Sequence, residues 1–209
     1  TFCPEYLRST AENAVVVDSV IRPAVAALPP GDEGFVLAYV RDSIRAPLLA
    51  CLHQLDRRSV VYGASAEECR GPVEARPLSP DFVHDLARCA CVVSTAGHQL
   101  ISEAYCLGKP MLAIPEPGQY EQYINAFYLE KVGGGRRCDR TSLSTRLVQD
   151  FVDSAAPRPR RAARGAEEVA KIVRTPMQAT PAPEYRSRPE PATGVAQAFL
   201  SVADRVVSK

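Results

Sequence analysis

The sequence predicts an α/β fold: a Rossmann-like, doubly wound parallel sheet of about five or six strands with helices on both faces. Two observations lead to this fold class. Between residues 34 and 131, apolar runs of strand length alternate with stretches of helical periodicity, which is typical of a parallel sheet covered on both sides. The length of 209 residues is enough for one such domain with a substantial core, and too short for two with linkers.

Five apolar runs are predicted to be strands. Each stops at a polar turn, a glycine or a change of periodicity. They cover residues 35–40, 59–62, 73–78, 89–93 and 111–114. Cys89 and Cys91 stand two residues apart in one run, so we expect both on the same side of that strand, where they would behave as small buried hydrophobic residues.

Helices are predicted between and after these strands. A helix from Pro47 to Leu55 would have proline in its first turn, and Ser79 followed by Pro80 has the form of an N-cap and a first helical position. Gly108 is placed to end the helix that follows residue 97. Further helical patterns cover residues 120–131, 143–152 and 165–173.

Composition argues against several classes of protein. The 25 basic and 24 acidic residues give a net charge of +1, so a nucleic-acid partner is not expected. The seven cysteines include no CxxC pair, so we expect neither a zinc site nor a disulfide framework, and no metal or other cofactor. Free cysteines suit a reducing compartment, which predicts a cytoplasmic location. No run is long enough to span a membrane, and no signal peptide is visible.

The stretch from residue 94 to residue 125 has the features of a ligand site. Small residues from Ser94 to Gly97 join a predicted strand to a predicted helix, whose first backbone N–H groups are unpaired beside the positive end of the macrodipole. That junction is a natural site for phosphate. Gly97 is expected to permit a turn that a Cβ would disfavour, and to let a ligand approach the backbone closely.

Glu103 is the only acidic side chain of this predicted helix, and its neighbours are apolar. A carboxylate among apolar side chains needs a partner, unless it is simply a solvated surface residue. Its two acceptor oxygens suit the vicinal diol of a ribose. In a parallel sheet, ligands bind outside the carboxyl ends of the strands, an edge that would bring together residues 41–43, 78–79, 95–99 and 116–122.

The order of Gly97, Glu103, Gly108-Lys109-Pro110, Pro115, Glu121-Gln122 and Asn125-Ala126 resembles the donor-binding signature of GT-B glycosyltransferases, the superfamily of MurG-like and UDP-glucuronosyltransferase-like enzymes. The resemblance implies a site for a UDP-sugar donor. It assigns the diphosphate to Thr95, Ala96, Gly97, His98 and Gln99, and the ribose to Glu103. It assigns the sugar to Glu121, Gln122 and Asn125. We expect the nucleotide base beside Leu78 and Ser79, and Arg41 and Ser43 at the rim of the cleft.

The sequence also departs from that signature. Thr95 stands where plant-type members have histidine, and His98 follows the glycine instead. The stretch between Pro115 and Glu121 is longer than in the signature, so the hexose is not indicated. The catalytic base of the family normally comes from the N-terminal domain, which leaves the catalytic residue unknown and His98 as the candidate within this chain. For Asn125, bracing of the loop is the alternative to a sugar contact. His53 and His84 are expected to be surface or packing residues.

The resemblance and the composition together divide the chain. Residues 1–30 are predicted to be the tail of a missing N-terminal domain with the interdomain connection, and residues 31–155 the nucleotide-sugar-binding domain. Residues 156–192 are predicted to be an Arg- and Pro-rich linker, partly disordered, and residues 193–209 a C-terminal helix. The arginines of residues 158–164 are interpreted as a solvated face rather than a membrane-binding surface. The start at Thr1 without Met indicates processing or a longer polypeptide.

We therefore predict the nucleotide-sugar-binding half of a glycosyltransferase. It would transfer a hexose to an acceptor held by an N-terminal domain in cis or by a partner subunit, in the cytoplasm or peripherally at a membrane. The isolated chain is expected to bind nucleotide and to turn over poorly or not at all. Three alternatives stay open: a non-catalytic donor-binding subunit that needs a partner chain, a protein similar to nucleotide-sugar 2-epimerases, and a degenerate pseudoenzyme. The acceptor, the hexose, the base and the oligomeric state are not indicated.

Overall fold

The fold is described from a computed structural model, which defines residue 2, residues 15–29 and residues 31–174. The described residues form one compact unit. Of the linker predicted over residues 156–192, residues 175–192 lie outside these ranges, and so does the helix predicted over residues 193–209. None of the described helices is long and apolar enough to cross a membrane.

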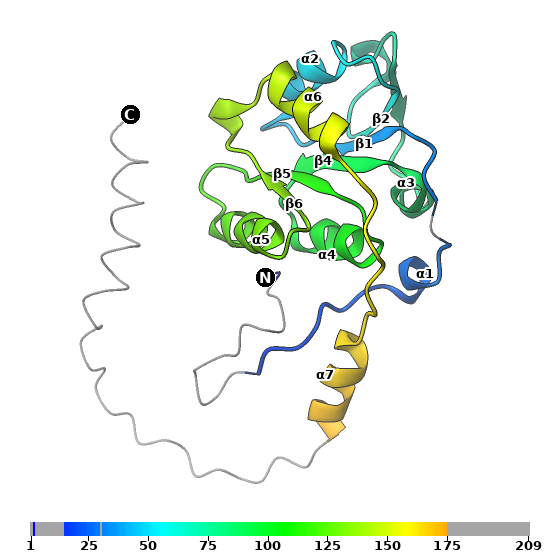
Figure 1. Ribbon diagram of the computed structural model, residues 1–209, viewed down its shortest axis with the longest axis vertical. Coiled ribbons are helices and arrows are strands. Elements are labelled where there is room, and N and C mark those ends of the chain that lie inside the picture. The colour runs from blue at the N-terminus through cyan, green and yellow to red at the C-terminus, as the bar shows by residue number, and fades with distance from the viewer. Residues whose placement is uncertain (1, 3–14, 30, 175–209) are drawn as a thin grey trace, which may run out of the picture. The chain divides into compact units, whose positions relative to one another are not determined.

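A sheet of six parallel strands forms the centre of the unit, in the order β3-β2-β1-β4-β5-β6 (Figure 1). The strands are β1 Val36–Tyr39, β2 Ser59–Tyr62, β3 Val73–Arg76, β4 Cys91–Thr95, β5 Met111–Ile114 and β6 Gly135–Arg137. The predicted α/β fold is confirmed. The sequence did not locate β6, because this edge strand has three residues that begin at a glycine and end in two exposed arginines.

The strand register places the apolar runs side by side. Leu37 of β1 lies between Val60 of β2 and Val92 of β4, and Val93 of β4 pairs with Leu112 of β5. Because all neighbours run in parallel, the chain must cross back over the sheet between consecutive strands, and most of these crossovers contain a helix.

Helices cover both faces of the sheet, as predicted (Figure 1). One face carries α3 Phe82–Arg88, α4 His98–Cys106 and α5 Tyr120–Lys131, with the short helix α1 Pro23–Ala26 beside them. The other face carries α2 Arg45–Leu52 and α6 Thr145–Ser154. Helix α7 Gly165–Arg174 follows, where a helix over residues 165–173 was expected. The two 3₁₀ turns are Ala66–Glu68 and Arg140–Ser142.

Most helix boundaries lie near the expected residues, although α2 begins at Arg45 and ends at Leu52 rather than running from Pro47 to Leu55. Pro47 lies in the first turn of α2, and Gly108 ends α4 with a φ of 72°, a conformation that favours glycine. The predicted start of α3 at Pro80 is wrong, since α3 begins at Phe82. Ser79 instead shapes a turn before the helix, where its Oγ accepts a hydrogen bond from the Asp81 N–H at 3.2 Å.

Cys89 and Cys91 are both fully buried, but they lie on opposite faces of the sheet. Cys91 packs on the side of α2 and α6, whereas Cys89 packs on the side of α3 and α4. The prediction of a shared side is wrong because β4 begins only at Cys91, so the alternation of a strand does not reach back to residue 89. Burial raises the pKa of the Cys91 thiol to about 12, which keeps it protonated and unreactive.

Residues 15–29 pack on the same unit as the sheet. Ile21 and Val25 are buried in the core on the side of α3 and α4. The Asp18 N–H donates to the carboxylate of Glu168 at 2.8 Å, which ties this segment to α7. That the segment is also the tail of a preceding domain stays a prediction.

Candidate functional site

The candidate site lies at the carboxyl ends of β1 and β4. From these two strands the sheet continues outward in opposite directions, to β2 on one side and to β5 on the other. The helix that follows β1 covers one face and the helix that follows β4 covers the other, so the connections diverge and leave a crevice between them. Helix α4 begins at this topological switch point, directly after β4, with Gly97 as its N-cap.

Gly97 is not required by the backbone conformation. Its φ of −65° and ψ of 138° are available to any residue, so the predicted need for a special turn is wrong. A Cβ atom at this position would have no heavy atom of the described residues within 4 Å, apart from its chain neighbours. The other expected role of this glycine therefore stands alone: its missing side chain lets a ligand approach the backbone at the start of α4.

The start of α4 presents unpaired donors. The Ile101 N–H donates to the Gly97 carbonyl at 3.1 Å, which is the first hydrogen bond of the helix. No side chain of the described residues caps the start of α4. The N–H groups of the preceding turn are thus left for a ligand, with the positive end of the helix dipole behind them. An anion is the ligand that this arrangement favours.

Asn125, in α5, holds the turn before α4 in place. Its Nδ2 donates to the Ala96 carbonyl at 2.9 Å, and its Oδ1 accepts from the Phe2 N–H at 2.7 Å. The side chain is fully buried, and both of its polar atoms are used. Asn125 therefore braces the turn, which was one of the two roles considered from the sequence. A sugar contact by Asn125 stays a prediction that this geometry does not favour.

Gln122 connects the same turn to the loop after β5. Its Oε1 accepts from the Ala96 N–H at 3.2 Å and from the Glu116 N–H at 3.1 Å, while its Nε2 donates to the Glu116 carboxylate at 2.9 Å. The neighbouring Glu121 is exposed and has no hydrogen bond or ion pair with the described residues. Of Glu121 and Gln122, which were both assigned to the sugar, Glu121 is therefore the one whose side chain remains available for a ligand.

The carboxylate of Glu116 is contacted by several polar groups of the cleft rim. Ser43 Oγ donates to its carboxylate at 2.6 Å, and Arg41 Nε lies 3.8 Å from it. The hydrogen bond from Ser43 is the main reason why the pKa of Glu116 lies below its ordinary value, against the opposite effect of burial. Residues 41–43, 95–99 and 116–122 thus meet at one edge, as the sequence predicts. Glu116 was not singled out beforehand, although an acidic residue just after a strand was a signal.

Glu103 is buried, with its side chain 1% exposed, and its partner is Arg22. The guanidinium makes a two-pronged pair with the carboxylate, Nε to Oε1 at 2.6 Å and Nη2 to Oε2 at 2.8 Å. Gln99 Nε2 also donates to Oε1, at 2.6 Å. The expectation that this carboxylate has a partner is confirmed, but the partner is an arginine 81 residues earlier in the chain, which sequence reasoning missed. The ribose contact stays a prediction.

His98 lies at the first position of α4 and is partly buried. Its Nδ1 is buried and has no hydrogen-bond partner among the described residues, and the same holds for the hydroxyl of Ser102 one turn later. Burial lowers the pKa of His98, while the charge of Glu121 acts in the opposite direction. The imidazole is therefore neutral at pH 7, a state that can donate a hydrogen bond from one nitrogen only.

Leu78 and Ser79 follow β3, farther from the switch point than the other rim segments. Leu78 is 66% exposed, and Ser79 lines a cavity of about 530 Å³ together with Tyr62 and Asp85. The Asp85 carboxylate is buried and accepts from the Tyr62 hydroxyl at 2.7 Å and from Arg76 at 2.5 Å. The described structure thus joins the ends of β2, β3 and α3 through one charged network. The contact of Leu78 and Ser79 with a nucleotide base stays a prediction.

Two solved structures have a fold related to that of this chain. MurG from Acinetobacter baumannii matches with a TM-score of 0.51 at 14% identity, covering 69% of this chain and 50% of that one. The spinosyn rhamnosyltransferase SpnG, complexed with spinosyn aglycone, matches with a TM-score of 0.52 at 19% identity, covering 70% and 45%. At these identities the matches show a shared α/β fold, over about half of each of the two solved chains.

The family follows from a sequence profile. The profile described as Glycosyl transferase family 1 matches residues 3–156, and the chain belongs to this family. Among curated relatives, the UDP-N-acetylglucosamine–N-acetylmuramyl-(pentapeptide) pyrophosphoryl-undecaprenol N-acetylglucosamine transferases of Bradyrhizobium diazoefficiens and Brucella anthropi are 31% identical over 155 residues and 25% identical over 153 residues. In both cases the match covers 72% of this chain and 38% of the relative, so the chain spans well under half the length of these proteins.

Proposed function

We propose that this chain is the nucleotide-sugar-binding half of a glycosyltransferase, with a UDP-sugar as the donor. The observation that carries the proposal is the open start of α4 at the switch point, where Gly97 leaves backbone N–H groups accessible. The names of the curated relatives, which use UDP-N-acetylglucosamine, support UDP as the nucleotide. The acceptor would be held by another domain or by a partner subunit, and a cytoplasmic or peripheral location is part of the proposal.

The reaction proposed is a direct displacement at the anomeric carbon of the donor sugar. The acceptor oxygen forms a bond to that carbon while the bond from the carbon to the diphosphate oxygen breaks, and the proton of the acceptor goes to a base outside this chain. The start of α4, from Gly97 to Gln99, would stabilise the charge that grows on the departing diphosphate. The chain alone is therefore expected to bind nucleotide and to transfer sugar poorly or not at all.

Glu103 is the residue proposed to hold the ribose. Its Oε1 already accepts two hydrogen bonds, but its Oε2 accepts only one from the described residues, so Oε2 retains a lone pair for a ribose hydroxyl. Because the side chain is 1% exposed, Arg22 or Gln99 must shift before a ribose reaches that oxygen. Arg22, whose side chain is 54% exposed, has room to do so.

Gly97→Val separates ligand binding from folding and so tests the proposal. The backbone of Gly97 suits valine and the space around it is open, so the variant should unfold at the same urea concentration as the parent. Its branched side chain would stand over the amides that a diphosphate needs, and we expect at least about tenfold weaker UDP binding by calorimetry, roughly 1.4 kcal/mol. Gly97→Ala should be intermediate. Unchanged UDP affinity in Gly97→Val, or no heat from the parent with UDP, would refute the proposed site.

A further inference from the structure

A second cavity lies at the opposite edge of the sheet from the proposed donor site. It has a volume of about 350 Å³ and is bounded by the ends of α4 and α5, close to the amino ends of β5 and β6. Its remaining wall is the segment of residues 158–161, which follows α6. The Arg158 N–H donates to the Gly108 carbonyl at 3.0 Å, which fixes this segment against the end of α4.

The lining of this cavity is strongly cationic. Four of its nine lining residues carry a positive charge, and none of the nine is acidic. The four are Lys109, Arg158, Arg160 and Arg161. Such a grouping of like charges is costly unless it is solvated or meets an anion, because like charges in a concave site raise each other's energy.

Lys109 is the buried member of the group, at 5% exposure. Its ammonium group donates to the Gly31 carbonyl and to the Cys89 carbonyl, the latter at 2.8 Å. Both acceptors are neutral, and no carboxylate of the described residues pairs with this ammonium. An ammonium group has three donors, so one N–H remains after these two bonds.

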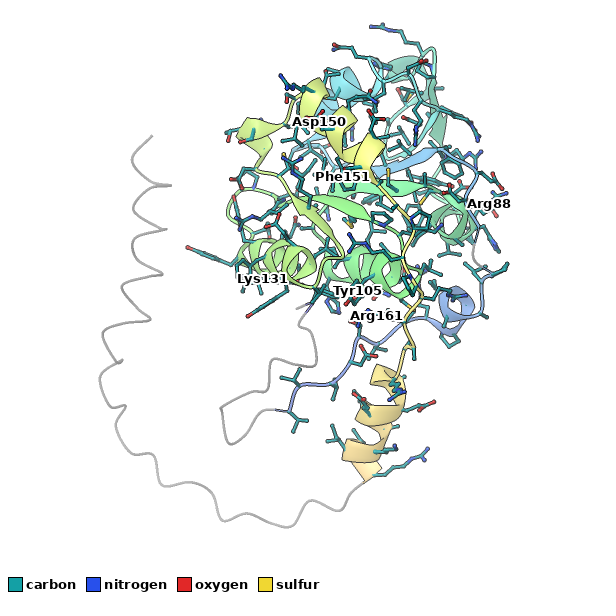
Figure 2. The ribbon with its side chains drawn as sticks, in the orientation of Figure 1. Arg88, Tyr105, Lys131, Asp150, Phe151 and Arg161 are labelled. Atoms are coloured by element: carbon teal, nitrogen blue, oxygen red, sulfur yellow. The ribbon has the colours of Figure 1, made fainter. Side chains whose placement is uncertain are left out.

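The three arginines also lack acidic partners among the described residues. Arg160 donates to the carbonyls of Leu28 and Ala26. The guanidinium of Arg161 lies over the ring of Tyr105, 4.7 Å from its centroid; both residues are labelled in Figure 2. The guanidinium of Arg158 has no hydrogen bond or ion pair with the described part of the chain. Each of these contacts leaves the positive charge in place.

Helix C-termini could account for some of this charge. Helices α4 and α5 both end at the cavity, and a helix C-terminus carries about half a negative charge. Two such ends amount to about one negative charge against four positive ones. A surplus of positive charge therefore remains around the cavity, where Arg158 and Arg161 are exposed.

We propose that this cavity binds a small phosphate-bearing anion. The guanidinium groups of Arg158 and Arg161 match the oxygens of a phosphoryl group in pairs, and Lys109, whose ammonium is held by carbonyls outside the lining, adds to the positive potential. The size of the cavity suits a mono- or diphosphate group. The site is distinct from the donor site, because it lies at the amino ends of the strands, and the proposal does not depend on the proposed transferase function.

Amide spectra of the full chain provide the test, with sodium pyrophosphate as the probe at low ionic strength. We expect saturable shifts of the Gly108 and Gly134 amides, which line the cavity, whatever happens at Gly97. The double variant Arg158→Gln/Arg161→Gln should weaken the binding seen at those amides at least about tenfold. The matched control, Arg140→Gln/Arg146→Gln, removes the same charge from exposed positions outside the cavity and should retain the parent affinity.

Several outcomes would overturn the proposal. Shifts confined to Gly97 and its neighbours would place the anion at the start of α4 only, and equal losses in both double variants would show general charge attraction. Sedimentation with vesicles of phosphatidylglycerol, without any shift by pyrophosphate, would make the arginines a membrane contact instead. UDP titration of the Arg158→Gln/Arg161→Gln variant should match the parent, so failure of the donor site and failure of this cavity are told apart.

Discussion

Removing Arg22 should cost more stability than removing the charge that it pairs with. In Arg22→Ala the carboxylate of Glu103 stays buried and keeps one hydrogen-bond donor among the described residues, Gln99. Breaking a buried ion pair by deleting one partner typically costs 3–5 kcal/mol. Because the side chain of Arg22 is 54% exposed, water can enter the space it leaves, and we expect the lower figure of about 2–3 kcal/mol.

Glu103→Gln removes the charge and keeps the shape. Arg22 then turns to solvent, and the loss should be about 1 kcal/mol, the net value of a hydrogen bond. In the double variant Arg22→Ala/Glu103→Gln no charge is left buried, so it should be about as stable as Glu103→Gln alone. The second substitution would thus restore about 1–2 kcal/mol to Arg22→Ala, which corresponds to a coupling energy of about 2–3 kcal/mol between the two side chains.

Urea unfolding followed by circular dichroism measures all four proteins of this cycle. A shift of the midpoint at constant slope shows that stability changed while the unfolded state did not. The reasoning is refuted if Arg22→Ala lies within about 0.5 kcal/mol of the parent, the range of ordinary surface substitutions. It is also refuted if the double variant is less stable than Arg22→Ala.

Two further substitutions test other parts of the molecule. Burial alone would raise the pKa of Asp85, but hydrogen bonds from Tyr62, Arg76 and Arg88 outweigh it and hold this pKa below its ordinary value. The ionised carboxylate therefore stabilises the folded state above the unfolded pKa of about 3.9, and this stabilisation is lost as the pH falls through the lower folded pKa. Asp85→Asn should be about 2–3 kcal/mol less stable than the parent at pH 7. Urea midpoints at several pH values should show this difference shrinking as the pH becomes acidic. Asn125→Ala should cost about 2 kcal/mol and weaken UDP binding, since the Ala96 carbonyl loses its donor. Asn125→Asp, which cannot donate, should lower the urea midpoint and the UDP affinity in the same way, and a UDP affinity like that of the parent would contradict the bracing role.

The central strands and helices could be predicted from the sequence because their signals are local. The apolar runs of β1, β2 and β5 stop at clear breakers, and Gly108 ends α4 where the sequence indicates. The short edge strand β6 has no such run, since its pairing with β5 rather than its side chains makes it a strand. The start of α3 was missed by two residues because Ser79 satisfies a turn instead of capping the helix.

The partners of the site residues were less predictable. That Glu103 needs a partner follows from its apolar neighbours, but the identity of Arg22 depends on how the segment before α1 folds back onto α4. Likewise, Gln122 stands in the expected place, yet its use as a brace depends on backbone groups of Ala96 and Glu116 in two other loops. Long-range hydrogen bonds of this kind leave no periodic pattern in the sequence.

The bonds of Gln122 and Asn125 to Ala96 have a consequence for engineering this fold. They fasten the turn before α4 and the start of α5 into one rigid piece. Replacing residues 116–122 alone by the corresponding loop of a relative would remove the Gln122 bond to Ala96 and leave the turn held by Asn125 only. A functional chimera would have to take the turn before α4, residues 116–122 and helix α5 from the same relative.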